Sequence, residues 1–349
     1  MKTNVVALGL VVLLLGCQPA SPPSAEISIR YMWDYVAGDY VRSQPAADDA
    51  AVYVGADDNA LHALDVRTGE TLWTYETADN ITSSPVVHRD VIYFGSWDGA
   101  VYALEAAQGD LRWRYETGGW VTASPLVGGD IVYVGSHDGF LYALGAEEGQ
   151  LLWRFETGDG IEGSAAFVDD LLLVGSMDNC LYALDIANGQ ARWRYCTEGD
   201  IVSAPAADAG TVYVGSVDRH FYALDAATGR LEWTFQAEFA IESSAVIGDG
   251  MVYFGANDGR LYALRARDGE LMWRFQAQDV IRSSPAVWEN LIFVGSDDGS
   301  LYGVDRPSGT LAWSYQTGGP IAAGPSVRNG RLYASSIDRR VYAFALGAE

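Results

Sequence analysis

The sequence predicts an all-β fold, an eight-bladed β-propeller of four-stranded antiparallel blades whose last blade is closed by the N-terminal strand. The first observation behind this prediction is a 40-residue repeat without gaps, marked by Trp33, Trp73, Trp113, Trp153, Trp193, Trp233, Trp273 and Trp313. The second is that each unit contains four short runs of alternating, β-branched and aromatic residues separated by turn signals. Four-stranded units of about 40 residues are typical of propeller blades, which stack in a ring because one small sheet cannot bury both faces.

The second unit illustrates the expected strands. Strand A is predicted at "ITSSPVV" (81–87), B at "VIYFGS" (91–96), C at "VYALE" (101–105) and D at "LRWRYET" (111–117). The "SWDG" of Ser96–Gly99 predicts a B–C hairpin turn, because Asp-Gly supplies the positive φ that such turns need. A recurring Gly, here Gly109, marks the C–D turn.

The chain ends set the number of blades. Seven complete units run from Val41 to about Gln316, and an eighth begins at Ile321 but stops after strand C, "VYAFA" (341–345). A spare strand D, "RYMWDY" (30–35), carries Trp33 in register. We therefore expect residues 30–35 to pair with residues 341–345, which removes an exposed sheet edge.

The N-terminal residues indicate targeting rather than folded structure. Lys2 precedes an apolar run, Val5–Leu15, that is too short to span a bilayer. The run ends in "LLGC", which resembles the lipobox of bacterial lipoproteins and implies cleavage before Cys17 and acylation of Cys17. The alternative is an ordinary secretory signal with a chance cysteine. We expect a signal peptide at 1–16, a Pro/Ser-rich tether at 17–28 and the propeller at 29–349, with Gln18 favouring the outer membrane by the same resemblance.

The net charge indicates which class of partner is excluded, and the cysteines indicate a possible disulfide. The formal net charge is −24, which argues against nucleic acid, because phosphate binding needs clustered Lys and Arg. Apart from Cys17, the chain contains only Cys180 and Cys196, which fall opposite each other when counted outward from the C–D turn of the fourth unit. A non-hydrogen-bonded pair would bring their Cβ atoms close enough for a bond, so we predict a structural disulfide, the alternative being two free thiols. We expect a monomer.

The repeat also resembles a known family. In "ALDVRTGETLW" (63–73), an Ala is followed six residues later by Gly and four further by Trp. This spacing recurs in the next five units, and the seventh is a variant with Gly303 in place of Ala. It is similar to the tryptophan-docking motif of the quinoprotein, or PQQ-like, propeller repeat, and the resemblance implies that each Trp packs between neighbouring blades. That fold serves both periplasmic alcohol dehydrogenases and BamB-type lipoproteins of outer-membrane β-barrel assembly, so it does not by itself fix the function.

Residues that vary between units are the candidates for function, because loops on a rigid scaffold carry binding residues. Four large or aromatic side chains fall in the top loops of blades 2 to 4, and we predict that they contact a protein partner: Trp97, Trp120, His137 and Met177. The alternative is unselected loop variation. Early in strand A, four charged residues are expected to line the central channel, where they either bind a small polar ligand or neutralise each other: Arg42, Glu162, Glu242 and Arg282.

Features expected of an enzyme are missing from the sequence. A quinoprotein dehydrogenase would imply PQQ, a calcium ion and an Asp base in the channel, and many such enzymes carry a vicinal Cys-Cys pair. Here every unit is minimal, no Cys-Cys pair occurs, and the four His show no metal-ligand spacing. We predict no catalytic residues, no metal and no cofactor. The predicted function is a membrane-anchored periplasmic scaffold similar to the BamB-type assembly factor; the alternative is a PQQ-like ligand binder or dehydrogenase that uses the channel.

Overall fold

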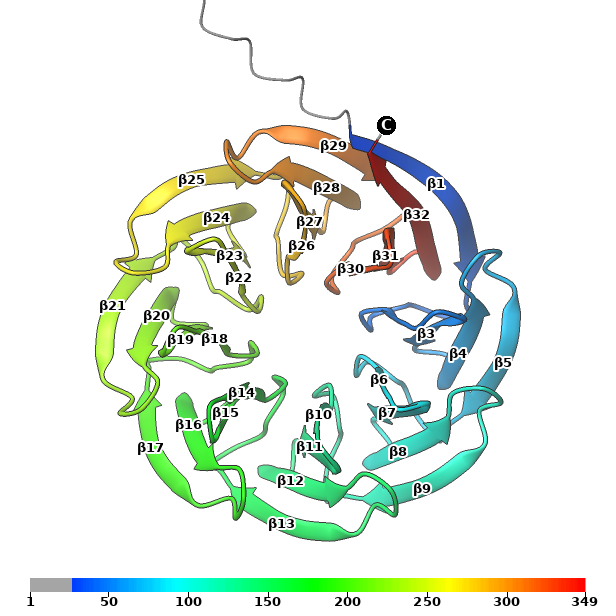
Figure 1. Cartoon of the computed structure of the whole chain (residues 1–349), viewed down its shortest axis with the longest axis horizontal. Helices are drawn as coiled ribbons and strands as arrows, with labels where there is room; N and C mark the ends of the chain where they lie inside the picture. The colour runs from blue at the N-terminus through cyan, green and yellow to red at the C-terminus, as the bar shows by residue number, and fades with distance from the viewer. Residues whose placement is uncertain (1–26, 349) are drawn as a thin grey trace, which may run out of the picture.

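The computed structural model describes residues 27–348 as eight four-stranded antiparallel sheets arranged around a central channel (Figure 1). The predicted eight-bladed propeller is confirmed. Within each blade the strands follow in order from the channel outward, so strand A is innermost and strand D outermost. The B and C strands are almost wholly buried, and each hydrophobic cluster joins two neighbouring blades.

The 32 strands fall into four equivalent sets. The A strands are β2 (Ala46–Ala47), β6 (Val86–His88), β10 (Leu126–Gly128), β14 (Ala166–Val168), β18 (Ala206–Asp208), β22 (Val246–Gly248), β26 (Ala286–Trp288) and β30 (Ser326–Arg328). The B strands are β3 (Ala51–Gly55), β7 (Val91–Gly95), β11 (Ile131–Gly135), β15 (Leu171–Gly175), β19 (Thr211–Gly215), β23 (Met251–Ala256), β27 (Leu291–Gly295) and β31 (Arg331–Ser336). The C strands are β4 (Ala60–Asp65), β8 (Ala100–Glu105), β12 (Phe140–Gly145), β16 (Cys180–Asp185), β20 (His220–Asp225), β24 (Arg260–Arg265), β28 (Ser300–Asp305) and β32 (Arg340–Ala348). The D strands are β5 (Thr71–Glu76), β9 (Leu111–Glu116), β13 (Leu151–Glu156), β17 (Ala191–Cys196), β21 (Leu231–Gln236), β25 (Leu271–Gln276), β29 (Leu311–Gln316) and β1 (Ile27–Val36).

Closure of the ring follows the predicted register. β1 pairs antiparallel with β32, with Arg30 opposite Ala345 and Tyr35 opposite Val341, and the two strands lie side by side in Figure 1. β1 begins at Ile27, so residues 27 and 28, which we assigned to the tether, belong to the strand. The predicted signal peptide, Cys17 and the rest of the tether lie outside the described residues.

The A strands are shorter than predicted. In the second blade only Val86–His88 forms a ladder, and the expected first part of the strand, residues 81–85, is irregular. Pro85 has no N–H to donate to a ladder. Side chains replace the missing bonds: Gly95 N donates to Ser83 Oγ over 3.0 Å, and Ser84 N donates to Ser124 Oγ of the next blade over 2.9 Å.

The repeated Trp joins adjacent blades. Trp73 Nε1 donates to the carbonyl oxygen of Ala106 in the next blade over 3.0 Å. Gly109, which has a φ of 75°, lies directly on this ring, and a Cβ added there would stand 2.6 Å from Trp73 Cε3. The Ala–Gly–Trp spacing therefore describes a contact between blades.

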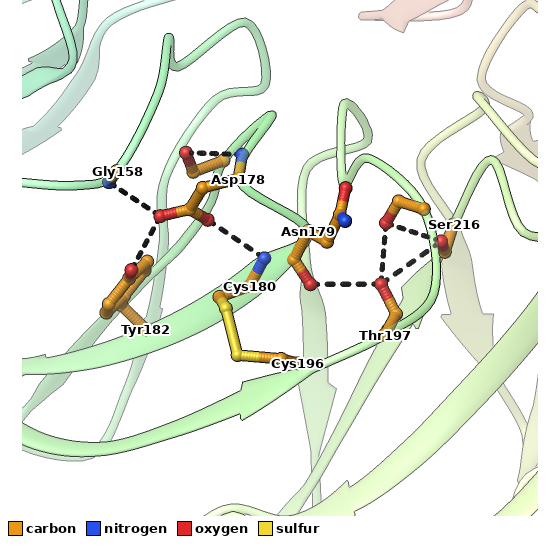
Figure 2. Close-up of a disulfide and its surroundings, with 10 residues drawn as sticks. Gly158, Asp178, Asn179, Cys180, Tyr182, Cys196, Thr197 and Ser216 are labelled. Carbon is orange, nitrogen blue, oxygen red and sulfur yellow. Dashed lines mark hydrogen bonds between the residues drawn. A yellow bond between two sulfur atoms is a disulfide. The ribbon is translucent and has the colours of Figure 1, made fainter.

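The repeated Asp fixes the top of each blade, as Figure 2 shows for the fourth. Asp178 accepts hydrogen bonds from Tyr182 Oη at 2.6 Å, Gly158 N at 2.6 Å and Cys180 N at 3.0 Å. Tyr182 and Cys180 belong to strand C, and Gly158 to the D–A loop that enters the blade. One carboxylate thus holds the D–A loop against the B–C turn, and the loops that vary rest on a fixed frame.

Candidate functional site

The top face of the ring is built from B–C turns and D–A loops joined by backbone hydrogen bonds. In the third blade, His137 N donates to the carbonyl of Trp120 over 2.8 Å, and the corresponding bond from Trp97 N to Asn80 O is 2.9 Å in the second. The equivalent bond from Met177 N to Gly160 O is 2.9 Å. The variable residues of turn and loop therefore alternate around the mouth of the channel.

The structure brings the four predicted partner-binding residues into one continuous arc. The rings of Trp97 and Trp120 stack, with centroids 4.9 Å apart and planes at 14°. The His137 ring lies 5.9 Å from Trp120. Gly160 separates His137 from Met177, since a Cβ at Gly160 would lie 3.3 Å from His137 Cα and 3.4 Å from Met177 Sδ. We call these four residues the aromatic arc.

Side chains of the turns also contact Thr82 and Thr122, which occupy in blades 2 and 3 the strand-A position that Arg42 occupies in blade 1. Trp97 Nε1 donates to Thr82 Oγ1 over 2.8 Å, and His137 Nε2 lies 2.8 Å from Thr122 Oγ1. These contacts fix the two rings from the channel side. The rim residues and the channel residues, which the sequence analysis treated as two sets, thus form one layer around the mouth.

The other half of this layer is charged. Arg42 Nε lies 2.9 Å from Asp57 Oδ2, and Arg282 pairs with Asp297 in the same way. Asn257 Nδ2 donates to Glu242 Oε1 over 2.7 Å. Three of the four predicted channel residues, Arg42, Glu242 and Arg282, therefore find their partners in the turn of their own blade, and the two Arg do not pair with Glu162 or Glu242.

Burial shifts the pKa values of acidic side chains in this layer. Burial raises the pKa of Asp57 and of Asp297, and in each case the neighbouring guanidinium, Arg42 or Arg282, opposes the shift. Desolvation also raises the pKa of Glu162, although this residue is exposed, and His137 opposes the shift. Three oxygens at equivalent turn positions are buried without a hydrogen-bond partner in the described part of the chain: Asp57 Oδ1, Asn257 Oδ1 and Asp297 Oδ1.

The channel layer does not fit a PQQ and metal centre. Among residues 27–348 no group of three or more His, Cys, Asp or Glu side chains is placed to hold a metal ion. The Arg side chains that could meet a quinone carboxylate are already paired with Asp57 and Asp297. We therefore derive no catalytic step through such a group.

In residues 27–348, the structure has no helix of the length and apolarity needed to cross a membrane.

Cys180 and Cys196 are joined by a disulfide, drawn in Figure 2. They lie directly opposite each other on β16 and β17, with Cα atoms 4.1 Å apart. A separation this short is that of a non-hydrogen-bonded pair, the geometry in which cross-strand side chains come closest. Both residues lie in the outer half of blade 4, away from the channel mouth.

One exposed residue of the top face, Phe239, was not predicted from the sequence. Phe239 is the most exposed large hydrophobic side chain of the described residues, with 59% of its surface accessible. The equivalent D–A loop position holds Asp or Gly in the other blades, for example Asp39, Asp79 and Gly119. A comparison of this loop position across all units would have identified it.

Comparison with known proteins defines the class of protein and then the family. The fold is that of PQQ-repeat propellers, and a family model described as outer membrane protein assembly factor BamB matches residues 30–96, 78–161, 137–277 and 257–347. These matches cover nearly the whole described chain, so the protein belongs to this family. No curated protein matches the chain.

Solved structures share the fold at low sequence identity. The crystal structure of BamB from Moraxella catarrhalis is 22% identical, with a TM-score of 0.79 over 91% of this chain and 100% of that one. A computationally designed protein, Ika8, is 19% identical, with a TM-score of 0.82 over 90% and 99%. A europium-containing methanol dehydrogenase is 15% identical, with a TM-score of 0.77 over 91% and 93%. At these identities the likeness concerns the fold.

Proposed function

We propose that this protein is a non-enzymatic, protein-binding propeller that serves as a scaffold in outer-membrane protein assembly, anchored by lipid at the periplasmic face of the outer membrane. Membership of the BamB family supports the general role. The single observation that carries the binding role is the aromatic arc, which gathers the aromatic side chains of the top loops of blades 2 to 4 on an otherwise acidic protein.

The geometry of the arc suits a protein contact. Trp120 is 50% exposed, although its ring stacks on Trp97. Trp97 is in turn fixed by its hydrogen bond to Thr82. Rigid, exposed Trp side chains surrounded by other contacts are the residues that most often dominate the binding energy of an interface. Because the rings are already ordered, little conformational entropy is lost on binding.

Replacement of the two stacked Trp tests this role. A Trp97→Ala/Trp120→Ala variant should lose its partner in affinity capture from cross-linked cell envelopes, with a loss of about 2 kcal/mol or more if the pair is a hot spot. Tyr40→Ala is the matched control, since Tyr40 occupies the equivalent loop position in blade 1 and is 42% exposed. Unchanged capture by the double variant would show that the arc is not the contact surface.

The lipid anchor is tested separately. Cys17→Ser should move the protein from the membrane fraction to the soluble fraction, because a lipoprotein without its acylated cysteine keeps no anchor. Retention of the variant in the membrane fraction would contradict the lipoprotein proposal while leaving the binding proposal intact.

The dehydrogenase alternative has a direct test of its own. Since Arg42 and Arg282 are already paired with Asp57 and Asp297, we expect no binding of PQQ in the presence of calcium by calorimetric titration. Stoichiometric binding would favour the alternative.

A further inference from the structure

The junction of blades 5 and 6 departs from the repeat in several places at once. Arg219 occupies a turn position that is Gly or Asn in six other blades, and Phe239 replaces the Asp or Gly of the D–A loop. Glu238 and Arg260 are also unusual, since most other blades have small residues at these positions. Arg219 lies in the β19–β20 turn, Glu238 and Phe239 lie in the β21–β22 loop, and Arg260 begins β24, at the left of Figure 1.

Three of the changed residues, Arg219, Glu238 and Arg260, line a groove of about 420 Å³ between the two blades. Its lining includes Arg219, Glu238, Arg260 and Arg274 together with two aromatic rings, Phe235 and Tyr262. The two rings pack edge to face with centroids 5.2 Å apart, so they give the groove a rigid apolar side. Phe239 follows Glu238 in the adjoining loop and is exposed.

One of the three arginines is held in place by the protein itself. Arg260 Nη1 lies 2.5 Å from Glu238 Oε1, and Arg260 Nε donates to Gln276 Oε1 over 3.0 Å. Its side chain is only 17% exposed. Arg260 therefore positions the loop that carries Glu238 and Phe239.

The other two arginines remain available for a ligand. Arg219 and Arg274 are exposed, and neither forms an ion pair within residues 27–348. The chain as a whole carries a net charge of −24, so two uncompensated guanidinium groups beside one groove are a marked local exception. Guanidinium groups bind carboxylates in bidentate fashion, which favours an acidic ligand.

The backbone at Arg219 has an unusual conformation for a long side chain. Its φ is 77°, in the left-handed region that disfavours a long side chain. Arg219 N donates to Ser216 O over 3.1 Å, and Ala237 N donates to Arg219 O over 2.9 Å, so the turn enforces this conformation. Asn or Gly would satisfy the same turn with less strain, but Arg339 in blade 8 shares this conformation, with a φ of 72°, so the conformation alone does not mark a site.

We propose that this groove binds an acidic, extended segment of a partner protein, with Arg219 and Arg274 bound to carboxylates and Phe239 in contact with an apolar side chain of the same segment. The groove lies apart from the aromatic arc, which is built on blades 2 to 4, so it supplies a second contact. A segment that binds here must overcome the repulsion of the acidic protein, which makes binding depend on the local cations and on ionic strength.

The test uses a fluorescein-labelled synthetic peptide of alternating Asp, Leu, Glu and Phe, with binding followed by fluorescence anisotropy at low and high salt. The Arg219→Asn/Arg274→Thr variant carries residues found at these positions in other blades and should bind about tenfold more weakly or worse. Arg339→Asn/Arg194→Thr is the matched control, because Arg339 has the same backbone conformation, with a φ of 72°, in blade 8. This control should bind as the unmodified protein does.

Each other outcome has a defined meaning. Equal loss in the test and control variants, or equal binding of a peptide with Lys in place of Asp and Glu, would overturn the proposal. Competition by inorganic phosphate as strong as that by the peptide would show a simple anion site instead of a peptide site. The Trp97→Ala/Trp120→Ala variant should bind the peptide normally, so failure of the groove and failure of the aromatic arc are distinguishable.

Discussion

At the scale of the residue, the repeat separates positions that build the ring from positions that can carry a function. Gly109 and Trp73 form a contact that recurs at nearly every blade junction, so neither marks a binding site. Trp120 and Phe239 stand at loop positions where the other blades place different residues, and both are exposed. A departure from the repeat is therefore more informative here than the repeat itself.

The contact between blades predicts a large cost for a single methyl group. Gly109→Ala should lower the free energy of unfolding by about 2 kcal/mol or more, because the Cβ would meet the Trp73 ring and Ala disfavours a positive φ. Gly129→Ala is the control: its φ is 61°, but no atom lies within 4 Å of the added Cβ, so it should cost about 1 kcal/mol. Urea unfolding measures both, and equal costs would contradict the packing argument.

The turn Asp predicts a pH dependence. Burial acts to raise the pKa of Asp218, but hydrogen bonds from Tyr222 Oη, Glu198 N and His220 N outweigh it and hold the pKa below its ordinary value. A lowered folded-state pKa contributes stability that is present above the unfolded-state pKa, about 3.9, and is lost as pH falls through the folded-state value.

Asp218→Asn should therefore cost about 1–3 kcal/mol at pH 7, because the side chain is only 5% exposed and its donors lose a charged acceptor. The difference from the unmodified protein should shrink below about pH 4. Asp208→Asn, at an exposed site, should show little change at any pH. A difference of the same size at pH 7 and at pH 2.5 would contradict the ionised carboxylate as the cause.

At the scale of the element, the sequence predicted the features that local periodicity and hairpin geometry determine. Strands B, C and D and the register of Cys180 with Cys196 follow from periodicity and from counting around a tight hairpin. The short A strands did not follow, because Ser83 and Ser84 replace ladder bonds with side-chain bonds, one of them to the next blade. The pairing of Arg42 with Asp57 could not be predicted from the sequence either, because it depends on how the B–C turn faces the channel.

The C–D hairpin of blade 4 predicts a modest contribution from its disulfide. Cys180→Ala/Cys196→Glu reproduces the residues of blade 1, Ala60 and Glu76, and should lower the free energy of unfolding by at most about 3 kcal/mol, because the bond closes a short loop. Reducing agent should destabilise the unmodified protein equally and leave the variant unchanged. Two alkylatable thiols in protein that was never reduced would contradict the disulfide.

At the scale of the whole molecule, stability depends on one pairing between the two ends of the described chain. β1 supplies the outer strand of the blade that β30, β31 and β32 begin. Trp33 on β1 is 6% exposed and packs against Gly69 of the first blade, so β1 also joins the last blade to the first. The aromatic arc and the groove at blades 5 and 6 are held in place by this closed ring.

Removal of β1 should therefore open the ring. A chain that starts at Ala37 exposes the edge of β32 and the surface that Trp33 covers, and an unpaired edge strand is a template for association. We expect dimers or larger species in size-exclusion chromatography with light scattering, and a lower melting temperature. A chain that starts at Ser24 keeps β1 and should stay monomeric. Adding a synthetic peptide of residues 27–36 to the shortened chain should restore the monomer, because it replaces the missing strand; a shortened chain that is monomeric and equally stable without the peptide would show that the pairing does not close the ring.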